Sequence, residues 1–146
     1  IKEINLDNLG VTIDFAHILY SNEQPALVAA LIDKHSKILG LHLNDGYGKR
    51  DDGLMVGSVH QLATMELLYQ VYKDGYNGAI YFDTFPDSTD LDPVKECEAN
   101  IDTVKKMLEV VKKLIADNSL SHAIANQDAV TSSQIFNKAL YNLNSK

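Results

Sequence analysis

The sequence has little of what disulfide-bonded or membrane-spanning proteins need. Its only cysteine, Cys97, has no partner for an internal disulfide and gives no zinc-type spacing, which favours a reducing compartment. No apolar run approaches the roughly 20 residues that a membrane span requires. The first residues also lack a basic and then apolar signal peptide. We therefore expect a cytoplasmic protein with no membrane partner.

Basic charge is also scarce, with 13 Lys and Arg against 20 Asp and Glu and a net charge of −7. This balance opposes recognition of a nucleic-acid backbone, which depends on clustered cations. We expect no nucleic-acid partner, and a small substrate that is neutral or held through a cation. With 45% hydrophobic residues, the chain has the material for a sizeable core.

Short β-branched or apolar segments alternate with longer helical patterns. Residues 11–15, 37–44 and 79–83 are expected to be strands, because they are short, apolar and bounded by turn residues. The apolar run from Ile38 to Leu43 predicts burial on both faces of the sheet. The order β-α-β-α-β-α predicts an α/β fold with three parallel strands, followed by C-terminal helices.

Several helix starts have recognisable signals. Ser58 is expected to cap a helix over residues 59–73, and Asp92-Pro93 to open one that runs to about Ala116. Thr131-Ser132-Ser133-Gln134 is a candidate capping box for the last helix. His60, in the first helical turn after Ser58, is expected to have a packing role.

Each expected strand carries a metal-ligating residue type at or near its end, namely Asp14, His42 and Asp83. Parallel strands in register place their carboxyl ends along one rim, so these side chains are expected to converge. Two carboxylates and an imidazole suit a divalent ion such as Mn²⁺, Mg²⁺, Co²⁺ or Zn²⁺. His17, in the strand-to-helix loop, and the pair Asp51 and Asp52 are candidates for a second ion nearby.

Plainer interpretations exist for each of these residues. A single aspartate at a strand end more often caps a helix, and a lone strand histidine is more often structural. Asp45, Asp51 and Asp52 are equally consistent with a solvated acidic loop. Three successive strands ending in this way favour the metal interpretation.

Four segments, taken together and in order, resemble the C-terminal part of the xylose-isomerase-like TIM barrels, with the closest similarity to rhamnose-isomerase-like sugar isomerases. The resemblance covers residues 9–115, and the combination is specific although His-Leu-Asn-Asp alone would not be. The segments are Asp14-Phe15-Ala16-His17, His42-Leu43-Asn44-Asp45, Asp51-Asp52-Gly53-Leu54-Met55-Val56-Gly57-Ser58-Val59-His60 and Phe82-Asp83-Thr84-Phe85-Pro86.

The resemblance implies metal-dependent isomerisation of a small sugar between aldose and ketose. It assigns one divalent ion to Asp14, His42 and Asp83. A second ion, near the reacting carbons, is assigned to His17 and Asp51, which become the candidate catalytic residues, with Asp14 bridging the two ions.

One departure from the family pattern concerns the second ion. The family loop has an acidic residue two positions after the one that matches Asp51, and Gly53 occupies that position here. Asp52 is the candidate substitute.

The resemblance further implies a partial TIM barrel, because eight βα units close a barrel and only the last three are recognisable. We expect one partial-barrel domain over residues 1–146, with a βαβαβα core over about 9–117 and C-terminal helices over about 118–146. The family's other metal carboxylate and its substrate-binding Lys and His lie on earlier strands. The chain is therefore expected to be inactive alone and to pair with the missing N-terminal half of the barrel or with a second copy.

Three alternatives remain open at this point. A sugar epimerase of the same superfamily needs one ion, and so tolerates the loss at Gly53. An apurinic endonuclease shares the barrel type, but the acidic charge argues against it. A non-enzymatic barrel remnant that only mediates association would bind no metal.

Overall fold

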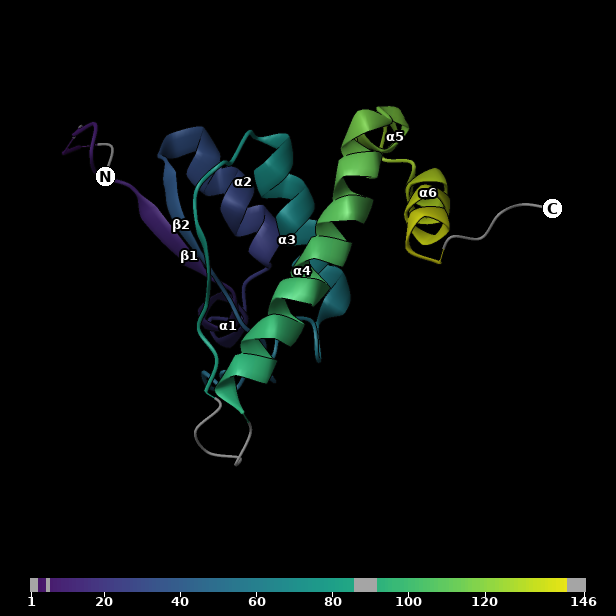
Figure 1. Cartoon of the computed structure of the whole chain (residues 1–146). Helices are drawn as coiled ribbons and strands as arrows, with labels where there is room; N and C mark the ends of the chain where they lie inside the picture. Colours follow the sequence, from purple (N-terminus) through teal and green to yellow (C-terminus); the bar gives the residue numbers. More distant parts are fainter. Residues whose placement is uncertain (1–2, 5, 86–91, 142–146) are drawn as a thin grey trace.

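The computed structural model describes residues 3–4, 6–85 and 92–141 (Figure 1). Pro86, which ends the last family-like segment, and residues 142–146, expected within the C-terminal helical region, lie outside the described residues. Within the described ranges, no helix combines the length and hydropathy needed to cross a membrane.

Three parallel strands form one sheet in the order β1-β2-β3, as the sequence predicts. The strands are β1 (Val11–Asp14), β2 (Ile38–Leu43) and β3 (Ile80–Phe82). The first expected strand ends one residue early, because Phe15 already belongs to a short helix. The α/β class with C-terminal helices is therefore confirmed.

Six helices lie in the described part of the chain. His17, expected in a loop, lies in the first of them, because the Asp14 side chain caps a helical turn directly after the strand. The helices are α1 (Phe15–Tyr20), α2 (Pro25–His35), α3 (Gln61–Lys73), α4 (Pro93–Ala116), α5 (Ser119–Ala125) and α6 (Ala129–Tyr141).

The helix starts agree with the sequence signals in one case and differ in two. Asp92 caps α4 through the amide of Val94, as expected. Ser58 does not cap α3, which begins only at Gln61. The capping box at Thr131 is also wrong, because α6 begins earlier and the carboxylate of Asp128 accepts bonds from the amide and hydroxyl of Thr131.

One face of the sheet is covered by helices and the other is not. Strands that follow one another in sequence order through right-handed crossovers place all their helices on the same side. Leu41 and Leu43 are therefore buried, whereas Thr12 and Tyr81, on the opposite face, are exposed. The expected burial of β2 on both faces is wrong for the described residues, since the side chain of His42 is only half-buried.

The core lies between the sheet and a layer made by α2, α3 and α4, which pack side by side. The long helix α4 crosses the molecule in Figure 1, with the sheet on one side and α6 on the other. Packing against this layer holds the strands in place, so the residues on the open face and at the strand ends keep fixed positions. Its fully or nearly buried side chains include Met65, Leu67, Leu68, Val71, Val104, Met107, Val111 and Leu114.

Candidate metal centre

Strand register brings the three predicted ligands together. Asp14 and His42 are direct partners across β1 and β2, and His42 is the direct partner of Tyr81 in β3. Side chains alternate between the faces of a strand, so Asp83, two residues after Tyr81, points to the same open face. The amide of Asp83 still donates to the carbonyl of Leu43, which extends the ladder to this position.

The geometry of the three side chains suits a divalent ion. Nδ1 of His42 lies 3.5 Å from Oδ2 of Asp14 and 3.5 Å from Oδ2 of Asp83. One ligand atom from each residue lies within 4.8 Å of the others. Ligand atoms about 2.0–2.2 Å from a common ion are separated from one another by roughly 3–3.5 Å. Asp14, His42 and Asp83 therefore require little rearrangement to hold such an ion.

Asp14 has two roles, because its two oxygens face different partners. Oδ1 accepts bonds from the amide of His17 at 3.2 Å and from Nδ2 of Asn44 at 3.3 Å. The fully buried Asn44 is itself fixed, since its Oδ1 accepts from the amide of Ala16 at 2.9 Å. Asp14 thus caps α1, as the plainer interpretation predicts, while its Oδ2 is aimed at His42.

Asn44 supports Asp14, a role that the sequence did not predict. It lies just after β2, two residues beyond His42. Apart from this position at a strand end, nothing in the sequence indicates that its amide supports a metal ligand. Groups that orient metal ligands in this way commonly matter about as much for the site as the ligands do.

His17 and Asp51 form a second pair beside Asp14. Nε2 of His17 lies 3.3 Å from Oδ2 of Asp51. The other oxygen of Asp51 is buried and has no hydrogen-bond partner in the described part of the chain. A buried carboxylate oxygen without a partner is costly, and a cation is one group that would compensate it. The residues present therefore fit a second ion at this position.

Asp52 does not take the place of the acidic residue missing at Gly53. Its Oδ2 accepts from the amide of Tyr47 at 2.8 Å, and its Oδ1 pairs with Nε of Arg50 at 2.7 Å. These bonds, the Tyr47 amide first, lower the pKa of Asp52, and Asp52 in turn raises the pKa of Arg50. The carboxylate therefore stays charged to lower pH and organises its own loop instead of facing His17.

Gly53 is required by the backbone. Its φ is +57°, a left-handed conformation that favours glycine, and a Cβ there would overlap the ring of Phe85. The carbonyl of Gly53 also accepts from the amide of Phe85 at 2.9 Å. The loop after β2 is thus closed against the segment after β3 at Gly53.

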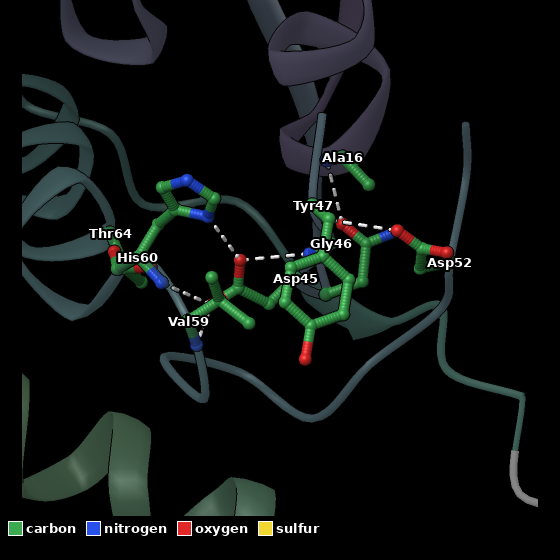
Figure 2. Close-up of polar contacts among 9 residues, drawn as sticks. Ala16, Asp45, Gly46, Tyr47, Asp52, Val59, His60 and Thr64 are labelled. Carbon is green, nitrogen blue, oxygen red and sulfur yellow. Dashed lines mark hydrogen bonds and ion pairs between the residues drawn. The ribbon is translucent and has the colours of Figure 1, made fainter. Parts of the chain in front are cut away.

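Asp45 is a fully buried carboxylate that ties this loop to α3 (Figure 2). Its Oδ1 accepts from the amide of Gly46 at 2.8 Å and contacts Nδ1 of His60 at 2.9 Å. Its Oδ2 accepts from the amides of Val59 and His60 at 2.9 and 2.8 Å. Asp45 therefore anchors the residues that lead into α3, including the N-cap His60, whereas Ser58 was expected to cap this helix and no described side chain caps it.

The loop is closed by a short bridge in which Asp45 and Leu54 exchange backbone hydrogen bonds, both 2.9 Å long. The idea of a solvated acidic loop is wrong, because Asp45 is fully buried and Asp52 is bonded within the loop. His60, expected only to pack, instead hydrogen-bonds Asp45 through its ring.

Comparison with known proteins gives one distant relative. No family profile matches the chain. An uncharacterised protein of Methanocaldococcus jannaschii is 25% identical over 117 residues, which make up 80% of this chain and 37% of that protein. The chain thus spans a little over a third of the length of this relative.

Replacing Asp45 should destabilise the fold far more than replacing an exposed aspartate. Asp45→Ala leaves buried amides without an acceptor, so we expect the free energy of unfolding to fall by about 3 kcal/mol or more. Asp102→Ala, which breaks an exposed ion pair with Lys106, should cost less than about 1 kcal/mol. Urea unfolding measures both losses, and equal losses would contradict the role of Asp45.

Placing an acidic side chain at Gly53 should fail for a steric reason. Gly75→Asp is the matched control, because Gly75 has φ +87° and open space around a Cβ. The control should cost about 1 kcal/mol from backbone strain alone. Gly53→Asp adds the overlap with Phe85, so a loss of at least about 2 kcal/mol is expected. Thermal or urea unfolding that ranks the two variants in the opposite order would disprove the steric argument.

Proposed function

We propose that the chain is the C-terminal segment of a divalent-metal-dependent sugar isomerase of the barrel type, which converts aldoses and ketoses. One observation carries this proposal: Asp14, His42 and Asp83 converge at the ends of three neighbouring parallel strands. The resemblance of four ordered segments to rhamnose-isomerase-like enzymes supplies the reaction. The cytoplasmic location expected from the sequence stays a prediction.

In this proposal some of the chain's residues bind metal ions and others hold those ligands in position. Asp14, His42 and Asp83 would hold one ion, and His17 with Asp51 would hold another. Bound cations would polarise the sugar carbonyl and stabilise negative charge on its oxygens. Asn44 keeps Asp14 in place, and the bridged loop after β2 keeps Asp51 in place.

The chain is proposed to need a partner for activity. In the described residues, β1 and β3 each pair with only one neighbouring strand, so both have a free edge. Such edges favour pairing with further strands, here the rest of a barrel or a second copy of the chain. A small-molecule sugar would bind over the open face, whose walls such a partner completes.

A sugar epimerase is a second candidate, and the conformation of Gly53 favours it. The backbone leaves no room for an acidic side chain at Gly53, and Asp52 is bonded within its own loop. Both facts leave a second ion with few ligands besides His17 and Asp51. A one-ion reaction, with proton transfer at a carbon next to a carbonyl, tolerates this deficit.

Metal titration tests the proposed site. Isothermal titration of the chain with Mn²⁺ should show binding, and Asp14→Asn or His42→Ala should weaken it at least tenfold, because each removes a ligand. Asp102→Asn and His122→Ala make the same changes at exposed positions on helices and should bind as the unmodified chain does. Absence of binding, or equal binding by all variants, would favour a non-enzymatic barrel remnant.

Turnover tests the need for a partner. With saturating Mn²⁺, the chain alone should not convert aldoses to ketoses, because the substrate-binding groups of the related enzymes lie on strands that it does not supply. The assay follows sugar products by chromatography. Isomerisation by this polypeptide alone would refute the proposal of a partner-dependent segment.

A further inference from the structure

Tyr81 packs its ring against the imidazole of His42. The two residues are direct neighbours across β2 and β3, on the open face of the sheet. Their ring centroids lie 5.5 Å apart and the ring planes meet at 67°, an edge-to-face arrangement that aromatic pairs prefer. Tyr81 keeps 53% of its surface exposed, so it does not serve to fill the core.

His42 lacks the usual support of a metal-binding histidine. Such a residue normally donates its other ring N–H to a carboxylate or carbonyl, which fixes the ring. Nδ1 of His42 faces Asp14 and Asp83, but no described residue hydrogen-bonds Nε2. Asp14, by contrast, is held by an amide and by Asn44. No hydrogen bond at Nε2 holds the plane of the His42 ring, so packing must restrict its rotation.

We propose that Tyr81 is a positioning residue, which fixes the ring plane of His42 so that Nδ1 is the atom offered to the ion. The edge-to-face contact restricts rotation of the imidazole, and the carboxylates of Asp14 and Asp83 select which edge of the ring points inward. Metal binding by His42 rests on the proposed function, whereas the orientation of its ring does not.

The phenol hydroxyl is not needed for this role. It has no hydrogen-bond partner among residues 3–4, 6–85 and 92–141. The aromatic ring alone makes the contact with His42. Tyr81→Phe should therefore preserve the orientation of His42, whereas Tyr81→Leu, which keeps an apolar side chain in the strand but no ring, should lose it.

The ring orientation can be measured in the metal-free chain by NMR. Nuclear Overhauser effects should connect the ring protons of His42 with those of Tyr81, and long-range ¹⁵N–¹H correlation identifies the ring resonances of His42. Tyr81→Leu should shift these resonances and weaken the Overhauser effects between the His42 ring and its neighbours Asp14 and Asp83, because the ring becomes free to rotate. Tyr81→Phe should leave the His42 resonances close to those of the unmodified chain, as should Tyr141→Leu, a matched change on α6, which lies away from the sheet in Figure 1.

Titration with Zn²⁺ adds a second readout. Tyr81→Leu should weaken binding about tenfold, the effect expected when support for a ligand is lost, and Tyr81→Phe should bind within about twofold of the unmodified chain. An unchanged His42 spectrum in Tyr81→Leu overturns the proposal. So does the lack of a Tyr81–His42 Overhauser effect in the unmodified chain, which needs no variant. A chain that binds no Zn²⁺ but shows the spectral changes refutes the metal site and leaves the positioning role supported.

Discussion

The parallel register of three short strands is the constraint on which the candidate site depends. It sets Asp14 beside His42 and His42 beside Tyr81, and the alternation along β3 returns Asp83 to the same face. A shift of one residue in any pairing would turn a ligand toward the helices. Burial of Ile13, Leu41 and Leu43 against those helices opposes such a shift, so the core that stabilises the sheet also sets the geometry of the site.

The loop after β2 depends on a different interaction, the burial of a carboxylate. Asp45 is fully buried, yet its oxygens are satisfied by amides and by the ring of His60. Because a buried charge is tolerated only when it is fully hydrogen-bonded, this network holds the loop in one arrangement. The loop carries Asp51 to His17, and so connects the start of α3 to the second candidate ion position.

The sequence predicted the strands and the convergence of Asp14, His42 and Asp83, because short apolar segments and strand-end positions are local features. It did not predict Asn44, since a buried amide is identified by what surrounds it in three dimensions. Ser58 was expected to cap α3 from nearby sequence, but the helix has no side-chain cap. The amides of Val59 and His60 just before it are bonded by Asp45, which lies more than ten residues upstream. The requirement for Gly53 likewise depends on Phe85, which follows α3 and β3 in the sequence but contacts Gly53 in the fold.

The central claim is that Asp14, His42 and Asp83 hold one divalent ion. Crystals of the chain grown with Mn²⁺, measured near the manganese absorption edge, test it most directly. We expect an anomalous peak within bonding distance of Oδ2 of Asp14, Nδ1 of His42 and a carboxylate oxygen of Asp83. An empty site at saturating Mn²⁺, or manganese bound only by other residues, would contradict it.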